Sequence, residues 1–135
     1  MASDRLRRDS QKKIVILDTN AILMLFEFSV DLAAELTRLL GSYHLVIPTS
    51  VVQELTRLSQ QGDGLKNRNA KAGLTLIKDI EQIEIHDLKG DDAVFSLAKQ
   101  LQGIVVTNDR NLRLQLKEQS LPVIFLRKKQ MLSIE

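Results

Sequence analysis

The chain has 135 residues, enough for one domain, and its hydrophobic (44%) and charged (27%) fractions are ordinary for a globular protein. It contains no cysteine, which excludes a disulfide framework, a thiolate nucleophile and a cysteine-based zinc site. No apolar run approaches the roughly 20 residues that a membrane span needs, and no cleavage signal follows the basic N-terminus. We therefore expect a cytoplasmic protein.

Positive charge is concentrated at the N-terminus. Residues 1–13 carry five basic side chains and two aspartates, so the rest of the chain is slightly acidic although the net charge is +2. Such an arm binds a polyanion or is simply solvated, and both interpretations stay open. We expect a basic, flexible arm over residues 1–13 and a single domain over residues 14–135.

Short apolar runs typical of buried strands alternate with amphipathic stretches typical of helices. In chain order the prediction is strand 14–17, helices 21–28 and 31–40, strand 45–47, a helix through 51–58, helix 65–80, strand 83–85, a helix between Gly90 and Gly103, strand 104–106, a helix through 112–116 and strand 122–126. Ser50 and Gln53 predict a capping box before the third helix. The alternation predicts an α/β, three-layer fold with a mostly parallel sheet of about five strands.

Acidic residues follow four of the predicted strands. Asp18 comes directly after the first strand, and Glu54 lies in the first two turns of the helix after the second. Asp91 and Asp92 open the helix after the third strand, and Asp109 follows the fourth. Strand carboxyl ends and helix N-termini share one edge of such a sheet, so the connectivity brings all these carboxylates to that edge.

Each acid by itself is explained by helix capping, because a carboxylate accepts hydrogen bonds from free N–H groups and opposes the helix dipole. Together they would repel one another by a few kcal/mol, and a bound cation would relieve that repulsion. Oxygen ligands without cysteine suit Mg²⁺ or Mn²⁺ rather than Zn²⁺. Asp91 either caps the helix while Asp92 binds metal, or shares that role. Asn20 and Thr107 either orient these carboxylates or serve turns and caps.

Two other classes of enzyme place an aspartate after the first strand. A haloacid-dehalogenase-type phosphatase needs a second aspartate two residues later, where this chain has Asn20. A receiver domain needs paired acids at the end of the first strand, and here the pair opens a later helix. Both fit the sequence less well. His44 and His86 flank strands without a partner at useful spacing, so we expect them to be structural or exposed.

The ordered set of motifs resembles the PIN-domain nucleases over nearly the whole chain after the arm. The matching segments are Leu17-Asp18-Thr19-Asn20-Ala21, Val52-Gln53-Glu54-Leu55, Asp91-Asp92-Ala93 with Ala98, and Val106-Thr107-Asn108-Asp109-Arg110-Asn111-Leu112. The likeness is greatest to archaeal PIN proteins related to ribosomal-RNA processing nucleases, and next to the VapC toxins of toxin–antitoxin modules.

The resemblance implies a Rossmann-like sheet and an Mg²⁺- or Mn²⁺-dependent endoribonuclease that cleaves single-stranded RNA. It implies that the catalytic metal ligands are Asp18, Glu54, Asp92 and Asp109. The residues that would orient these ligands or hold metal-bound water are Asn20, Asp91 and Thr107. One or two ions would bridge the carboxylates and the scissile phosphate, and nearby cations would contact flanking phosphates. Those cations are Arg110, Arg113, Lys66, Arg68 and Lys71.

Homodimers are frequent among PIN domains, so a homodimer and an antitoxin or ribosome-assembly partner are further expectations of the resemblance. The alternative from another functional class is a non-catalytic PIN module that binds RNA or protein during ribosome assembly.

Overall fold

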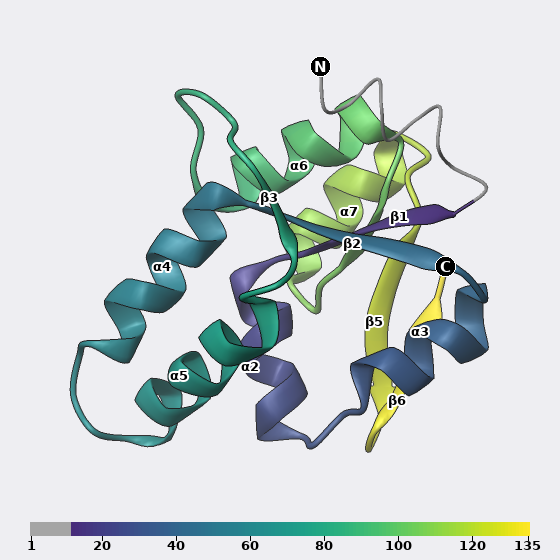
Figure 1. Cartoon of the computed structure of the whole chain (residues 1–135). Coiled ribbons are helices and arrows are strands. Elements are labelled where there is room, and N and C mark those ends of the chain that lie inside the picture. Colours follow the sequence, from purple (N-terminus) through teal and green to yellow (C-terminus); the bar gives the residue numbers. More distant parts are fainter. Residues whose placement is uncertain (1–11) are drawn as a thin grey trace.

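The computed structural model describes residues 12–135, so the expected basic arm lies outside the described residues except for Lys12 and Lys13. One sheet of six strands runs through this part of the chain (Figure 1), in the order β3-β2-β1-β4-β5-β6. The strands are β1 (Lys13–Leu17), β2 (Tyr43–Pro48), β3 (Glu81–Ile83), β4 (Ile104–Val106), β5 (Val123–Lys128) and β6 (Met131–Ile134). All neighbours pair in parallel except β5 and β6, which are antiparallel. The predicted fold class is confirmed.

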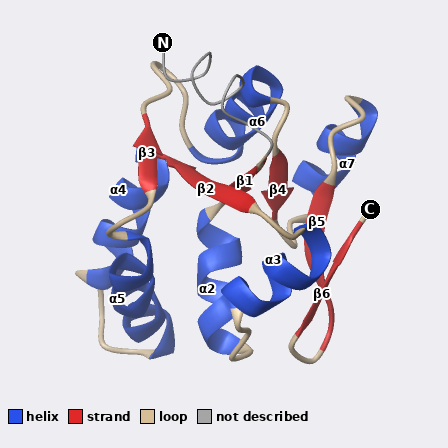
Figure 2. Ribbon diagram, turned by 45° about the vertical axis from the view of Figure 1, so that its right-hand side comes forward, coloured by secondary structure: helices blue, strands red, loops and turns tan. Residues whose placement is uncertain are grey.

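Helices cover both faces of the sheet and extend beyond one edge of it (Figure 2). They are α2 (Thr19–Glu27), α3 (Leu32–Leu40), α4 (Thr49–Ser59), α5 (Leu65–Ile77), α6 (Gly90–Leu101) and α7 (Arg110–Glu118). Helices α6 and α7 lie on one face, whereas α3 packs against β2 and β6 on the other. Helices α4 and α5 pack on each other and on α2. Among these described helices, none is long and apolar enough to cross a bilayer.

The centre of the sheet is fully apolar, which explains why its strands could be predicted from composition. Val15, Ile16 and Leu17 of β1 are completely buried, as are Val105 and Val106 of the neighbouring β4. A strand between two parallel neighbours and beneath two helical layers has no solvent-facing side, so its apolar run is continuous. The carboxyl ends of β1 and β4 are thereby held rigidly beside each other.

The strand predictions differ from the structure most at β3 and β6. The strand expected at 83–85 pairs at Glu81–Ile83, because β2 ends at Pro48, opposite Ile83, and offers no backbone partner farther on. Strand β6 was not predicted. It is only four residues long, but its Leu132 is fully buried.

The outer edge of β6 is closed by helix α3. The backbone N–H of Leu132 donates to Glu35 Oε1 (2.8 Å), and its carbonyl accepts from Arg38 Nη2 (2.7 Å). Glu35 and Arg38 also form an ion pair with each other at 2.9 Å. These bonds occupy backbone groups of a sheet edge that would otherwise be open to pairing with another chain.

The capping box predicted at Ser50 and Gln53 is wrong. Helix α4 begins two residues earlier than this box requires, at Thr49, and its N-cap Pro48 has no side chain that can accept a hydrogen bond. The Ser50 hydroxyl is buried and makes no hydrogen bond within the described structure.

The close approach of α5 to α2 depends on Gly73. A Cβ atom at this position would lie 2.6 Å from Cγ2 of the fully buried Ile22. That methyl group is attached at a β-branch and cannot swing away freely. The glycine therefore sets the distance between the two helices.

We predict that Gly73→Ala lowers the free energy of unfolding by about 1–3 kcal/mol, as overpacking of a core does. Alanine in an uncrowded helix would instead stabilise the protein by about 1 kcal/mol. Urea denaturation monitored by circular dichroism measures the difference. Gly64→Ala, at the N-cap of α5, controls for a glycine-to-alanine change without a clash, because a Cβ there has open space around it. A stabilised Gly73→Ala variant would contradict the described packing.

Candidate active site

Asp18 lies at the junction of β1 and α2 and is only 3% exposed. Its Oδ1 accepts a hydrogen bond from the backbone N–H of Ala21 (2.6 Å), so the side chain caps helix α2. Its Oδ2 accepts from the hydroxyl of Thr107 (2.5 Å), which follows β4. The carboxylate thus connects the ends of the two central strands, and both of its oxygens are held in fixed positions.

The loop after β4 is ordered by its own side chains. The hydroxyl of the fully buried Thr107 also accepts from the backbone N–H of Asp109 (3.0 Å). Asp109 Oδ1 caps helix α7 by accepting from the backbone N–H of Leu112 (3.0 Å). Asn108 Oδ1 accepts from the backbone N–H of Leu126 on β5 (2.8 Å). Thr107 therefore orients Asp18 and positions Asp109 at the same time.

A cavity of about 250 Å³ opens where these elements meet. The junction of β1 and α2, helices α4 and α6, and the loop after β4 contribute to its wall. The lining residues are Asp18, Thr19, Asn20, Val51, Glu54, Gly90, Asp91, Val94 and Asp109. Thr19 holds Glu54 by donating its hydroxyl to Oε2 (3.1 Å). Carboxylates from α4, α6 and the two loops are therefore gathered in one polar cavity, as the strand-edge argument predicts.

Asp91, rather than Asp92, faces this cavity. Among the described residues that line it are Asp91 and Val94, which share one face of α6, whereas Asp92 is absent from the lining. Successive residues in a helix are rotated by about 100°, so a shift of one position turns the side chain away. The N-cap of α6 is Lys89, with no side-chain capping bond, so Asp91 does not serve as the cap.

Two carboxylates of the cavity, Asp18 and Asp91, have pKa values raised above their ordinary value, chiefly by burial. Burial raises the pKa of Asp18 to about 6, although the hydrogen bonds from Thr107 and Ala21 act in the opposite direction. The negative charges of Asp91 and Asp109 add to the rise. The pKa of Asp91 is also raised, chiefly by desolvation and then by Asp109, Asp92 and Glu54. The site is therefore one electrostatic unit that favours a proton or a cation.

The donor chemistry of the cavity fits a hard, partly hydrated cation. Its polar lining consists of carboxylate, hydroxyl and amide oxygens. Within residues 12–135, no three Asp, Glu or His side chains converge closely enough to cage an ion by themselves. Mg²⁺ usually keeps several water ligands and uses one or two carboxylates plus substrate phosphates, so it does not need such a cage.

The predicted phosphate-binding cations fall into two groups. Arg110 opens α7 directly after Asp109, and Arg113 lies one turn later. Arg113 is paired with Glu135 (3.0 Å) and lies over the Phe125 ring at 4.1 Å from its centre. The second group, exposed on α5, is Lys66, Arg68 and Lys71, and none of them lines the carboxylate cavity.

The two histidines lie outside the cavity lining given by the described residues. His44 Nε2 lies 3.0 Å from Glu81 Oε1, between strands β2 and β3. His86 is largely exposed, with Glu84 as its neighbour at 3.9 Å. These positions agree with the structural or exposed roles expected for them.

Comparison with known proteins identifies the family. Residues 15–129 match the family described as "PIN like domain". The chain belongs to this family. Two of its relatives are "Ribonuclease VapC9" of Archaeoglobus fulgidus, 27% identical over all of this chain and 98% of that protein, and "Ribonuclease VapC4" of Methanocaldococcus jannaschii, 27% identical over 89% of this chain and 95% of that protein.

Solved structures agree with the PIN fold. The PIN domain endonuclease Utp24 superposes with a TM-score of 0.74 and 22% identity over 90% of both chains. VapBC-1 from nontypeable Haemophilus influenzae gives a TM-score of 0.56 and 16% identity over 78% of this chain and 93% of that chain. The resemblance inferred from the motifs is confirmed.

We predict that Asp18 makes the metal-free PIN domain less stable as the pH rises. Its pKa in the folded protein, about 6, exceeds the ordinary value of 3.8, so folding favours the protonated acid. The protonated acid therefore contributes up to about 3 kcal/mol to the free energy of unfolding. This contribution is fully present below about pH 4 and is lost as the pH rises through 6. Urea denaturation in EDTA between pH 4 and 7, for the wild type and Asp18→Asn, isolates it.

Asparagine can still accept the N–H of Ala21, so Asp18→Asn should be the more stable protein at pH 7. Asp63→Asn, in an exposed loop, controls for loss of one negative charge. The prediction fails if the difference between wild type and Asp18→Asn does not change across this pH range.

Proposed function

We propose that this PIN domain is a divalent-metal-dependent endoribonuclease that hydrolyses phosphodiester bonds of single-stranded RNA, with Mg²⁺ or Mn²⁺ as cofactor. The observation that carries the proposal is the cavity in which Asp18, Glu54, Asp91 and Asp109 meet. Support for RNA as the substrate comes from the two full-length relatives, both named ribonucleases. The cysteine-free composition is compatible with action in the cytoplasm.

Each carboxylate has a proposed role in holding the cation. We assign Asp18 and Asp91 as the principal ligands, because both line the cavity and both have raised pKa values. Asp109 uses Oδ1 as a helix cap, so we assign its Oδ2 to the ion. Glu54, held by Thr19, completes the acidic set. When bound, the ion supplies Lewis acidity toward water and phosphate.

The protein's own residues prepare the site for this ion. Thr107 and the N–H of Ala21 fix both oxygens of Asp18, so little ordering remains to be done when the cation binds. Asn20 is an exposed residue of the lining, and we propose that its amide orients a water or the substrate there. Arg110 follows Asp109 directly and is placed to contact a phosphate next to the cleaved one.

A buried acid with a raised pKa also bears on the non-catalytic alternative. A module that only binds RNA or protein would keep the helix cap that Asp18 provides, but it would gain nothing from the two further carboxylates beside it. Such a cluster lowers stability unless a cation compensates for it. We therefore favour the nuclease over the non-catalytic assembly module.

We propose an antitoxin as the protein partner of this domain. The relatives that match nearly the whole chain are named VapC, and a structure titled VapBC-1 shares its fold. The motif resemblance to ribosomal-RNA processing nucleases makes a role in ribosomal-RNA processing the second possibility, and the fold shared with the PIN domain endonuclease Utp24 is compatible with it. A homodimer stays a prediction, which the molecular mass in solution would test.

We predict that Asp91→Asn abolishes Mg²⁺- or Mn²⁺-dependent cleavage of an unstructured, end-labelled RNA, whereas Asp92→Asn retains most of the activity. The reason is that, of these two aspartates, Asp91 lines the cavity and Asp92 does not. Asparagine removes the negative charge with almost no change in shape. Because the substitutions are adjacent and chemically identical, each controls for the other. EDTA should stop the wild-type reaction, since the carboxylates alone provide no Lewis acid.

An inactive Asp92→Asn variant beside an active Asp91→Asn variant would reverse the assignment. Full wild-type cleavage in EDTA would remove the metal from the mechanism altogether.

A further inference from the structure

A second cavity of about 380 Å³ lies beside the carboxylate site, along helix α7. Its lining residues are Asn108, Arg110, Arg113, Leu114, Lys117 and Glu135. Asn108 and Arg110 are the sequence neighbours of Asp109, which lines the first cavity. The loop after β4 therefore contributes to both cavities, of which the first is lined mainly by acids and the second mainly by cations.

The basic residues of the second cavity form one stripe. Arg110, Arg113 and Lys117 are spaced by three and four residues, so they lie on the same face of α7. Among the described residues that line this cavity, Glu135 is the one acid, and it is paired with Arg113. The stripe therefore has more positive than negative charge, in contrast to the neighbouring site.

Arg113 is held in place before any ligand arrives. Its guanidinium lies 4.1 Å from the centre of the Phe125 ring and 3.0 Å from Glu135 Oε1. A cation that is already stacked loses less side-chain freedom when it binds a phosphate. Glu135 occupies the place where a phosphate oxygen would make the same contact, so it should compete with such a ligand.

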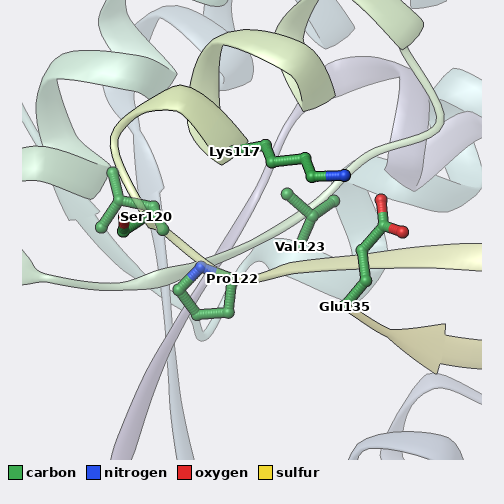
Figure 3. Close-up of a pocket in the computed structure, with 6 residues that line it drawn as sticks. Lys117, Ser120, Pro122, Val123 and Glu135 are labelled. Atoms are coloured by element: carbon green, nitrogen blue, oxygen red, sulfur yellow. The ribbon is translucent and has the colours of Figure 1, made fainter.

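The hollow continues to the far end of α7. Lys117 and Glu135 also line a third cavity of about 280 Å³ with Ser120, Pro122 and Val123. Figure 3 shows the Lys117 and Glu135 side chains extending toward each other. From Arg110 to Lys117 the helix rises by about 10 Å, so the basic stripe is elongated and too long for a single phosphate group.

We propose that this surface, the α7 groove (Asn108, Arg110, Arg113, Leu114 and Lys117), binds the RNA backbone that leads away from the scissile phosphate. The proposal rests on the proposed function and adds the path of the substrate. The strand runs from the carboxylate cavity past Asp109, and Arg110, Arg113 and Lys117 contact successive phosphates. Contacts of this kind give affinity without base specificity. Glu135 weakens the binding by its charge.

The test measures binding separately from cleavage. Asp91→Asn protein in EDTA is titrated into a fluorescent 12-residue oligouridylate, and anisotropy is recorded from 50 to 200 mM salt. Adding Arg110→Ala and Lys117→Ala should weaken binding on the order of tenfold and lower the slope of log affinity against log salt by about 1.4, or 0.7 per lost phosphate contact. Lys78→Ala with Lys99→Ala, two exposed lysines elsewhere, removes the same charge and should leave the slope unchanged.

Two further variants sharpen the result. Glu135→Gln should tighten binding several-fold, because it removes the acid that competes for Arg113. Lys66→Ala with Lys71→Ala tests a path along α5 instead. The α7 groove would be overturned by a loss of RNA affinity confined to the α5 pair. It would also be overturned by an equal loss in the α7 pair and in the control pair of Lys78 and Lys99. An absence of measurable RNA binding at 50 mM salt would overturn it as well.

The outcome is distinguishable from failure of the proposed function. If wild-type protein with Mn²⁺ leaves the RNA intact on a gel while the α7 variants still lose binding, the nuclease proposal fails and the groove stands. If the wild type cleaves but the α7 pair binds with the unchanged slope, the groove is wrong and the nuclease proposal survives.

Discussion

The architecture of the site depends on one interaction, the seating of the Asp18 carboxylate between the N-terminus of α2 and the hydroxyl of Thr107. These two bonds join neighbouring strands β1 and β4 at the edge where the acids gather. These hydrogen bonds only partly offset the free-energy cost of burying a negative charge, so the pKa of Asp18 remains raised, at about 6. The fold thus keeps a carboxylate in a place that disfavours its ionised form. A bound cation would turn this local cost into a gain.

Capping and catalysis are compatible at this edge. Asp18 and Asp109 both cap helices, yet both also line the cavity with Asp91. A cap uses one oxygen of a carboxylate, which has further lone pairs for other partners. The helix N-termini therefore position the acids, and the cap and ligand interpretations of each acid need not exclude each other.

Much of the fold followed from the sequence because the parallel strands are buried on both faces and appear as continuous apolar runs. Strand β4 was predicted with its observed bounds, and the family resemblance is confirmed. Strand β6 was missed because only its short Leu132 segment is buried and its outer edge is closed by Glu35 and Arg38, which are far away in sequence. No local pattern could reveal those long-range bonds.

The choice between Asp91 and Asp92 shows where the prediction of the site reached its limit. The topology predicts that the acid pair opens α6 at the cavity, but a helix turns by about 100° per residue. Which of the two acids faces inward depends on how α6 packs on the sheet. The helical spacing does carry a signal: Asp91 lies three and seven residues before the buried Val94 and Ala98, whereas the same steps from Asp92 lead to Phe95 and the exposed Lys99. No capping bond adds to it, since the N-cap Lys89 makes no side-chain bond. Thr107 was recognisable because it directly follows a buried strand.

The central claim is that the carboxylates form a cation site centred on Asp18 and Asp91. Anomalous diffraction from crystals soaked in Mn²⁺ tests it directly, because the ion is located without reference to any activity. The account predicts a peak in the cavity within about 2–2.5 Å of carboxylate oxygens of Asp18 or Asp91, with water completing the coordination. Absence of a peak there at millimolar Mn²⁺, or a peak held by Asp92 outside the cavity, would contradict it.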